Sequence, residues 1–348
     1  MNFLPLRMVA PIGFGAFFLA LASCKDQEKN AWPGPTVEEK AAEAAPAATP
    51  PAEATQPAPV AEAPAAPPAA EEADPELVRF IAYNLENWLS MDRYVDGQST
   101  QDAPKPEKEK EAAVTLIARH RPDILGVCEI GQKSDLQDLQ ARLAKAGLDL
   151  PNLYHTGGAD DTRHLGLLTR FPIASTTPHT DLEYSLEGRK FIMGRGVLDA
   201  VVETPNGPVH FFGAHLKSKR EIPEADQEEM RRAEARLLRE QVDHVLEADP
   251  ETPLIVYGDM NETRGNSAVR ILQGPRNGPM SLGMAYLRDS VGTTWTHFWS
   301  YQDVYSRFDY VLFSHPMTSR FEWDHCKVLD DPEVGDASDH RPLYVEFR

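Results

Sequence analysis

Five short polar motifs in this sequence each end, or directly follow, an apolar run of strand length. They are Asn84-Leu85-Glu86, Cys128-Glu129, His215-Leu216-Lys217-Ser218, Gly258-Asp259-Met260-Asn261 and Ser338-Asp339-His340. Acids, amides and histidines at strand ends can meet at one edge of a sheet. Carboxylates that leave coordination positions open can hold a hard divalent cation, which stabilises negative charge developing on an ester. The motifs therefore predict a metal-assisted hydrolase.

Two of these motifs suggest particular chemistry from residue type alone. Glu129 closes an apolar run, where a carboxylate without a cation would be costly to bury. Asp259 and Asn261 stand two residues apart, so both point to the same side of a strand end. The acid can orient or deprotonate water, while the amide can contact a phosphate oxygen. The alternative for this pair is an Asx turn that caps the next helix.

Eight apolar or β-branched runs have the length of strands and must position these motifs. They are Val78–Tyr83, Ile124–Cys128, Leu165–Thr169, Gly196–Val202, Val209–Ala214, Leu254–Tyr257, Phe308–Phe313 and Leu343–Phe347. Helices are predicted at Glu107–His120, Gln132–Ala146 and about Pro223–Leu246, with Pro223 in the first turn. Stretches rich in Gly and Asp are predicted loops at Thr156–His164, Asp181–Arg189 and Glu262–Pro279. Strands and helices mixed in this way imply an α/β fold with sheets inside and helices outside.

The five motifs, together with Arg307-Phe308-Asp309-Tyr310, resemble in order the endonuclease/exonuclease/phosphatase family. This superfamily includes pancreatic deoxyribonuclease, apurinic endonucleases, sphingomyelinases and inositol polyphosphate phosphatases. The resemblance covers residues 78–348. It implies a four-layer α/β sandwich, in which helices flank two central, mostly antiparallel sheets. It also implies an enzyme, a phosphoesterase that depends on Mg²⁺ or Mn²⁺.

The resemblance assigns metal ligands to three acids. Glu129 is implied as the principal ligand, with Glu86 and Asp339 beside it. The alternative for Glu86 is a surface acid, since many members of the family carry Asp at that position. Asn84 is implied to fix either a phosphate or a carboxylate that binds the metal.

The resemblance also assigns catalytic roles. His340 is implied to contact the scissile phosphate, with Asp309 orienting its ring through the other nitrogen. His215 is implied to protonate the leaving oxygen or to bind phosphate. Asp259 and Asn261 complete the predicted catalytic set.

Weaker candidates are the basic and aromatic residues near the motifs. Lys217, Lys219 and Arg220 form a short basic cluster, Arg163 and His164 precede a predicted strand, Trp88 is a candidate for the rim, and Trp295-Thr296-His297 is expected to pack between layers. The basic cluster is either a polyanion contact or a solvated loop. Arg195 either pairs with an active-site acid or is structural.

Charge and cysteine content narrow the choice of partners. The chain has 35 Lys and Arg against 54 Asp and Glu, a net charge of -19. Such a chain is a poor candidate for tight, sequence-blind duplex binding. It can still turn over phosphate substrates, because a bound cation changes the local field. Cys128 and Cys326 lie in strand-like runs and are expected to be buried thiols, and a disulfide between them is allowed in an exported protein.

The N-terminal residues indicate export. Arg7 precedes an apolar run that closes on Leu21-Ala22-Ser23-Cys24, and the whole resembles a bacterial lipoprotein signal with Cys24 lipidated. The alternative is an ordinary signal peptide with a chance cysteine. We therefore expect a signal peptide over residues 1–23, a disordered Ala/Pro/Glu-rich tether over 24–76 and the catalytic domain over 77–348. The predicted location is a membrane surface facing the periplasm or the cell exterior.

The preferred substrate is nucleic acid, cut as a phosphodiester by an endonuclease, and no obligate protein partner is predicted. The alternative is a phospholipid or sugar-phosphate phosphoesterase. A lipid substrate calls for an exposed aromatic loop beside the cleft, and Phe298-Trp299-Ser300-Tyr301 is the run that resembles one. A third hypothesis is a binding module that keeps the fold without catalysis.

Overall fold

The computed structural model describes residues 74–95 and 98–348. The predicted signal peptide, Cys24 and nearly all of the predicted tether lie outside the described residues. Within the described part of the chain, no helix is long and apolar enough to cross a membrane.

Two six-stranded sheets form the centre of the domain. The first has the order β17 (Lys327–Val328), β18 (Leu343–Phe347), β1 (Val78–Trp88), β4 (Ile124–Ile130), β6 (His164–Thr169), β5 (Asn152–Thr156). The second has the order β13 (Gly283–Met284), β16 (Asp309–Phe313), β12 (Leu254–Asp259), β11 (Gly207–His215), β10 (Val197–Thr204), β7 (Ile173–Thr176). Each sheet has one parallel pair at its centre, β1–β4 and β11–β12, and its other pairs are antiparallel. The prediction of two mostly antiparallel sheets is confirmed.

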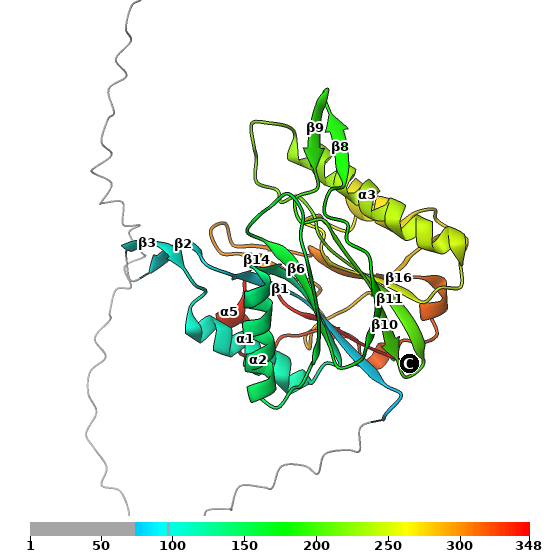
Figure 1. Cartoon of the computed structure of the whole chain (residues 1–348), viewed down its shortest axis with the longest axis horizontal. Helices are drawn as coiled ribbons and strands as arrows, with labels where there is room; N and C mark the ends of the chain where they lie inside the picture. The colour runs from blue at the N-terminus through cyan, green and yellow to red at the C-terminus, as the bar shows by residue number, and fades with distance from the viewer. Residues whose placement is uncertain (1–73, 96–97) are drawn as a thin grey trace, which may run out of the picture. The chain divides into compact units, whose positions relative to one another are not determined.

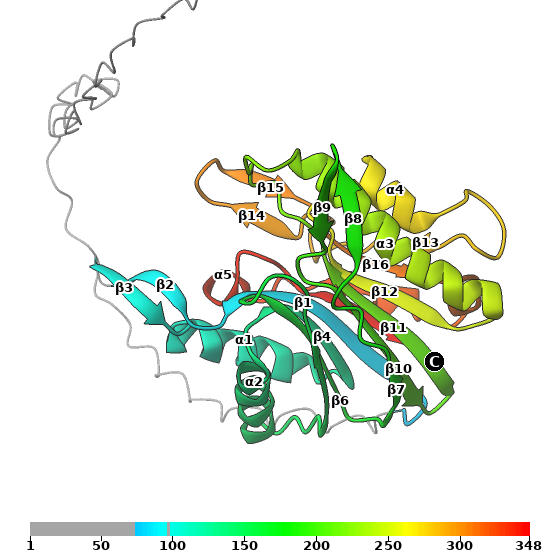
Figure 2. The ribbon, with the colours of Figure 1, turned by 45° about the horizontal axis from the view of Figure 1, so that its top comes forward.

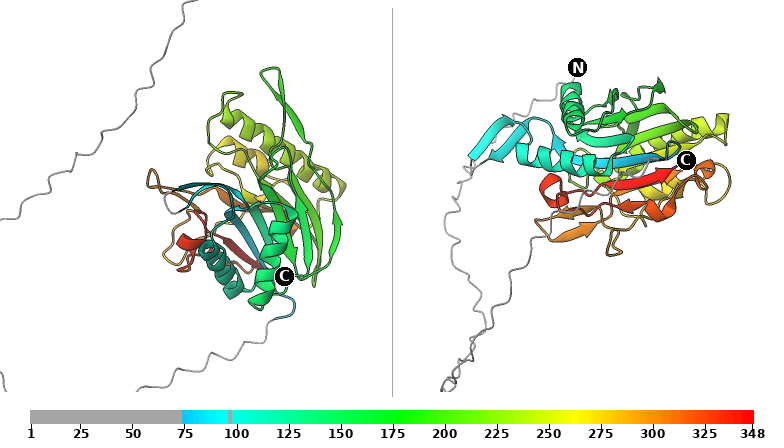
Figure 3. Two further views of the ribbon diagram at one scale, coloured as in Figure 1. Left: turned by 60° about the vertical axis from the view of Figure 1, so that its left-hand side comes forward. Right: turned by 90° about the horizontal axis from the view of Figure 1, so that it is seen from below.

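Helices cover the outer face of each sheet (Figures 1 and 2). Residues of α1 (Glu107–His120) and α2 (Lys133–Lys145) share one apolar cluster with the first sheet. Residues of α3 (Gln227–Ala248) and α4 (Ser267–Gln273) share another with the second sheet. A third cluster fills the space between the sheets. The result is the predicted four-layer sandwich, and Figure 3 shows its layers from the side.

The strand β1 illustrates why the sheets are buried on both faces. Successive side chains of a strand point to opposite faces. Phe80 and Ala82 pack between the sheets, whereas Ile81 and Tyr83 pack against the helices. A continuous apolar run is the pattern expected of such a strand. The strand continues beyond its predicted end at Tyr83, so Asn84 lies within it.

A tyrosine fixes how closely the two sheets approach each other. The ring of Tyr257 lies between the sheets, with its centroid 5.0 Å from that of Phe80. A Cβ at Gly126 would be 2.2 Å from this ring, and a Cβ at Gly213 would be 2.7 Å from its hydroxyl. Both positions therefore require glycine. The hydroxyl of Tyr257 is buried without a hydrogen-bond partner among the described residues.

Three short hairpins extend from the sandwich. They are β2 (Met91–Val95) with β3 (Gln98–Ala103), β8 (Glu183–Leu186) with β9 (Arg189–Ile192), and β14 (His297–Trp299) with β15 (Val304–Ser306). The hairpin of β8 and β9 corrects the prediction of an irregular loop at 181–189. Glu187 and Gly188 form its two-residue turn, both with positive φ (49° and 78°). This turn geometry matches the twist of paired strands.

The helix boundaries show one further correction. The third predicted helix begins at Gln227 and not at Pro223, because Asp226 caps it. The Asp226 carboxylate accepts hydrogen bonds from the backbone N–H groups of Glu228 and Glu229, both at 2.9 Å. The predicted loop at 262–279 contains the short helix α4. The remaining helical turns are α5 (Val334–Ala337) and the 3₁₀ turns η1 (His315–Met317) and η2 (Trp323–His325).

Both cysteines of the described chain are free thiols, so the disulfide alternative is not realised. Cys128 is buried in β4, as expected. Cys326 is only half-buried and lies at the end of η2, just before β17, so its prediction as a buried strand residue is wrong.

Candidate active site

The two central parallel pairs bring the predicted residues to one edge of the sandwich. Asn84 is in β1, and Glu129 is near the end of the adjacent β4. His215 ends β11 opposite Asp259 at the end of β12, and Asp259 faces Asp309 at the start of the antiparallel β16. Each sheet thus contributes residues to the same place.

The Asn84 amide joins the two sets of residues. This side chain is 1% exposed. Its Nδ2 donates to Asp259 Oδ2 at 3.1 Å and to Glu129 Oε1 at 3.4 Å. The same atom lies 3.4 Å from His340 Nε2. One buried amide therefore contacts three of the other predicted residues.

His340 is held between two carboxylates. Its Nδ1 lies 2.8 Å from Asp309 Oδ2, and its Nε2 lies 3.7 Å from Asp259 Oδ2. Burial lowers the pKa of His340, but the charges of Asp309 and Asp259 outweigh burial and raise that pKa well above its usual value. The Thr296 hydroxyl accepts the Asp309 backbone N–H at 3.0 Å and fixes the start of the strand. The two carboxylates therefore favour the protonated form of His340.

His215 has the opposite character. It is 2% exposed, and its Nε2 lies 3.5 Å from Asp259 Oδ2 and 3.8 Å from Glu129 Oε1. Burial, and then the positive charge of Arg195, lower the pKa of His215 well below its usual value. Its Nδ1 has no hydrogen-bond partner among the described residues. A neutral imidazole has one donor nitrogen and one acceptor nitrogen, and the carboxylates facing Nε2 favour the donor there.

Asp259 and Asn261 lie in the site as predicted, and they also form an Asx turn. The Asn261 backbone N–H donates to Asp259 Oδ1 at 2.8 Å, which is an Asx turn. The turn lies within the site and does not cap a helix, since α4 begins after Asn266. The Asn261 Nδ2 group is engaged with the Leu216 carbonyl at 3.0 Å and Asp259 Oδ2 at 3.4 Å. Burial raises the pKa of Asp259 to about 7.

The three predicted metal ligands share one rim but do not form a closed cage. The Asp339 backbone N–H donates to Glu86 Oε2 at 3.0 Å, and Glu129 Oε2 accepts the Asn87 backbone N–H at 3.0 Å. Burial and the neighbouring Asp339 charge raise the pKa of Glu86 to about 7. Crowded, partly buried carboxylates fit a hard divalent cation, which relieves their repulsion.

Two tighter groups of potential ligands also occur at this site. In each, the donor atoms lie within 4.8 Å of one another: His297, Asp339 and His340 in one group, and Asp259, Asp309 and His340 in the other. Neither group contains Glu86 or Glu129.

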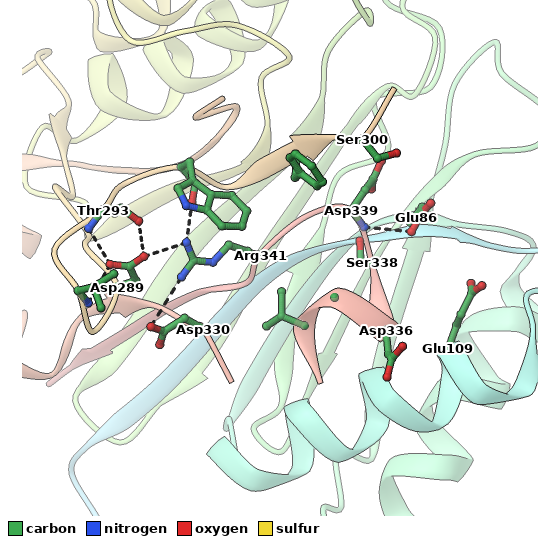
Figure 4. A pocket seen from close by; sticks show the side chains of 15 residues that line it. Glu86, Glu109, Asp289, Thr293, Ser300, Asp330, Asp336, Ser338, Asp339 and Arg341 are labelled. Carbon is green, nitrogen blue, oxygen red and sulfur yellow. Dashed lines mark hydrogen bonds and ion pairs between the residues drawn. The ribbon is translucent and has the colours of Figure 1, made fainter. Parts of the chain in front are cut away.

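A cleft of about 660 Å³ opens over these residues. Seven of the nine predicted metal and catalytic residues line it: Glu86, Glu129, His215, Asp259, Asn261, Asp339 and His340. Asn84 and Asp309 lie behind this surface and are buried. A second hollow of about 730 Å³ adjoins the cleft and shares Glu86 and Asp339 with it (Figure 4).

The weaker candidates divide into two groups. Arg163, Arg195, Lys217 and Arg220 line the cleft. Arg195 faces Asp160 at 3.4 Å and not an active-site acid. Lys219 pairs with Glu262 at 2.7 Å, His164 is buried against the Gly131 carbonyl, and Trp88 is fully buried and so is not at the rim.

Several residues that position the site were not predicted from the sequence. His297 was expected between layers, but it lines the cleft with its Nε2 3.6 Å from Asp339 Oδ2. On α3, Glu234 is 2% exposed and accepts the backbone N–H groups of Gly194 and Lys217. Arg231 on the same helix face binds Glu262 and the Ser218 carbonyl. A signal was present, because Arg231 and Glu234 fall among the apolar positions of the buried face of α3.

Comparison with known proteins agrees with this geometry. The Endonuclease/Exonuclease/phosphatase family matches residues 95–340. Comparison with curated protein sequences gives no match.

Three solved structures share the fold. An endonuclease/exonuclease/phosphatase from Bacteroides vulgatus is 16% identical, with a TM-score of 0.54 over 78% of this chain and 98% of that chain. The human nocturnin catalytic domain with a bound sulfate anion is 17% identical, with a TM-score of 0.53 over 78% and 94%. Truncated TDP2 from Caenorhabditis elegans is 14% identical, with a TM-score of 0.51 over 78% and 97%.

Proposed function

The chain belongs to the endonuclease/exonuclease/phosphatase family, whose members are metal-dependent phosphoester hydrolases, and from that premise we propose that it is a nuclease that cuts nucleic acid internally. Its metal in this proposal is Mg²⁺ or Mn²⁺. The nocturnin domain of the same fold carries a bound sulfate, which is a tetrahedral anion like the phosphate of the proposed substrate.

The observation that carries the proposal is the buried junction at Asn84. Its amide contacts Glu129, Asp259 and His340 across the two sheets. Maintaining two acids, an amide and a histidine in the interior is expensive unless they act together. A purely structural junction would not need to open onto a cleft lined by the same acids. This arrangement favours an enzyme over a binding module that lacks catalysis.

Each residue has a proposed role. Glu129, Glu86 and Asp339 hold the cation, which when bound stabilises negative charge on the phosphoryl oxygens. The His340 imidazolium binds a phosphoryl oxygen through Nε2, and Asp309 orients the ring through Nδ1. Asp259 positions or deprotonates the attacking water.

Two more residues have supporting roles in the proposal. His215 binds phosphate or protonates the leaving oxygen through Nε2. Asn261 holds Asp259 in place, because both hydrogens of its amide group are already engaged.

The test is nicking of supercoiled plasmid in the presence of Mg²⁺, Mn²⁺ or chelator, with Asp259→Ala as the inactive comparison. We expect nicking that requires the metal and that Asp259→Ala lacks. Folding of the variant is followed by circular dichroism. Plasmid left intact by a folded wild-type protein that hydrolyses a simple phosphodiester would refute the nuclease and keep the phosphoesterase.

One observation favours the lipid alternative. Trp299 and Tyr301, at the tip of the β14–β15 hairpin, are 48% and 85% exposed. The same hairpin carries His297 into the cleft, so its aromatic tip is close to the site. Exposed aromatic side chains of this kind suit a membrane interface. This alternative would be favoured if the wild-type protein hydrolyses sphingomyelin in vesicles but does not nick plasmid. The double variant Trp299→Ser/Tyr301→Ser should then lose the hydrolysis of sphingomyelin.

We also propose, from the sequence alone, that the protein is exported and anchored through lipidated Cys24. Mass spectrometry of the mature N-terminus tests this directly, since a lipidated Cys24 has a characteristic added mass. Cys24→Ser should move the protein from the membrane fraction to the soluble fraction. A Cys24→Ser protein that still fractionates with membranes would contradict the anchor.

A further inference from the structure

The two sides of the site differ in their cations: four line the cleft and one lines the adjoining hollow, although six carboxylates line each of them. We define the basic wall as Arg163, Arg195, Lys217 and Arg220, which line the cleft. We define the acidic pocket as the adjoining hollow, whose lining has six carboxylates and a single cation, Arg341. Glu86 and Asp339 belong to both linings, and Figure 4 shows them at the hollow.

The cations of the basic wall have few close acid partners. Arg163 Nε lies 3.9 Å from Glu129 Oε2, and Arg195 Nε lies 3.4 Å from Asp160 Oδ2. The Arg195 Nε atom is buried without a hydrogen-bond partner among the described residues. Elsewhere, cations such as Lys108 and Arg170 contact their acids at 2.8 and 2.9 Å. Burial and the nearby Arg195 lower the pKa of Lys217, which indicates like charges held close together.

Buried residues of α3 hold this arrangement in place. Glu234 accepts the backbone N–H groups of Gly194 and Lys217, which are next to or within the wall. Arg231, 2% exposed, donates to the carbonyls of Lys217 and Ser218. The loop that carries Lys217 is therefore fixed to the helix and is not a freely solvated basic run. Fixed cations that repel one another are stabilised by a bound anion.

The opposite side disfavours an anion. Arg341 is already paired with Asp289 at 3.0 Å. Glu109 and Asp336 pair with Lys105 and Lys108, which do not line the pocket. No cation of the described lining is left to receive a phosphate there. The aromatic side chains of Trp295 and Phe298 line the same hollow and suit an uncharged group.

From this asymmetry we infer that the basic wall is an anion subsite that binds a second phosphate of the substrate on one side of the scissile phosphate. The acidic pocket takes the uncharged part on the other side. The inference rests on the proposed function and deepens it, since it states where the neighbouring phosphates of a nucleic acid lie.

The test measures how well three nucleotides inhibit hydrolysis of bis(p-nitrophenyl) phosphate at constant free Mg²⁺. Thymidine 5′-monophosphate and thymidine 3′-monophosphate each carry one phosphate, and thymidine 3′,5′-bisphosphate carries two. We expect the bisphosphate to inhibit about tenfold more strongly than either monophosphate, as a charge-assisted contact predicts. Arg195→Gln and Arg220→Gln should each reduce this ratio, and the double variant should bring it close to one.

Matched controls separate the subsite from general charge effects. Lys145→Gln removes one positive charge from the exposed end of α2 and should leave the ratio at the wild-type value. Glu247→Gln, at an exposed position of α3 outside both linings, should also leave it there. A wild-type ratio near one, or a ratio that survives in the double variant, would overturn the inference.

The outcome can be told apart from failure of the nuclease proposal. The inhibition assay uses a simple ester, so it works whether or not the protein cuts plasmid. If the simple ester is not hydrolysed, titration calorimetry of the three nucleotides with the Mg²⁺-loaded protein measures the same ratio. Equal affinities for all three would then overturn the subsite.

Discussion

The pKa values of the two buried histidines of the site are shifted in opposite directions. Carboxylates on both sides raise the pKa of His340, whereas burial and nearby cations lower that of His215. The surroundings therefore favour the protonated form of His340, which suits a phosphoryl oxygen, and the neutral form of His215. The residue types alone could not assign these charges, because they follow from contacts between distant segments.

The pairing of His340 with Asp309 leads to a residue-scale prediction. His340→Gln should lower kcat by about 10² to 10⁴, the range expected when a charged catalytic group is lost. Asp309→Asn should lower kcat by a smaller factor, because the His340 ring remains in place with a weaker hydrogen-bond partner. Initial rates on a simple phosphodiester check this order, and circular dichroism confirms folding. A larger loss for Asp309→Asn than for His340→Gln would contradict the assigned roles.

Two tyrosines on adjacent strands provide a matched test of hydrogen bonding. The Tyr257 hydroxyl is buried and has no hydrogen-bond partner in the part of the chain that the structure describes, whereas the Tyr310 hydroxyl donates to the Arg307 carbonyl at 2.9 Å. Tyr257→Phe should therefore stabilise the domain by about 1 kcal/mol, and Tyr310→Phe should destabilise it by about 1 kcal/mol. Urea unfolding measures both. Changes of the same sign would show that packing, and not hydrogen bonding, decides these sites.

At the scale of elements, α3 packs on its sheet and also holds residues beside the active site in place. Its Arg231 reaches Glu262, and Glu262 in turn accepts from Lys219 at 2.7 Å. Burial would raise the pKa of Glu262, but the hydrogen bonds from Lys219, Asn266 and Arg231 lower it to about 2. The helix, the Lys217–Arg220 loop and the end of β12 are thus joined through one carboxylate.

This carboxylate predicts an acid-sensitive contribution to stability. A lowered pKa stabilises the folded state above the usual value of 4.5, and the contribution disappears as pH falls toward about 2. Because Lys219 is partly exposed, we expect about 1–2 kcal/mol at pH 7. Glu262→Gln should remove this amount at pH 7 and nothing at pH 2, measured by urea unfolding. The exposed Glu247→Gln in α3 is the control, and an equal loss at both pH values would contradict the prediction.

What the sequence could predict follows from burial. Strands covered on both faces, such as β1 and β12, have apolar runs that are recognisable without a structure. The β8–β9 hairpin was missed because its strands are short and mostly exposed, with little apolar signal. Glu234 and Arg231 were missed because a charged residue on an amphipathic helix normally faces solvent. Their partners come from loops that only the fold brings near.

The polar motifs predicted which residues share the site, but not how their side chains contact one another. The order of six polar motifs predicted which residues share the edge of the sandwich, since each follows a buried strand. Their side-chain partners depend on the approach of two sheets and could not be predicted. The Asn84 amide between Glu129 and Asp259 is the clearest case.

For the molecule as a whole, the proposed metal should act as a stabilising ligand. Glu86, Glu129 and Asp339 come from three separate strands or turns, so a cation among them links distant segments. Mg²⁺ at a hundredfold excess over its Kd should stabilise the folded state by about 2.7 kcal/mol. Thermal unfolding with Mg²⁺ and with chelator measures the shift, and Glu129→Gln should abolish it. An equal shift in Glu129→Gln would place the cation elsewhere.

The pairing of β1 with β18 has a consequence for synthesis. Val78 is opposite Phe347, so one edge of β1 can pair only with a strand that lies far along the sequence. Contacts of such high sequence separation slow folding and leave the nascent chain incomplete until late in translation. His340 arrives at the same late stage, which means that the chemistry appears only when the fold closes. A chain in which β18 has not yet paired with β1 therefore lacks a complete active site.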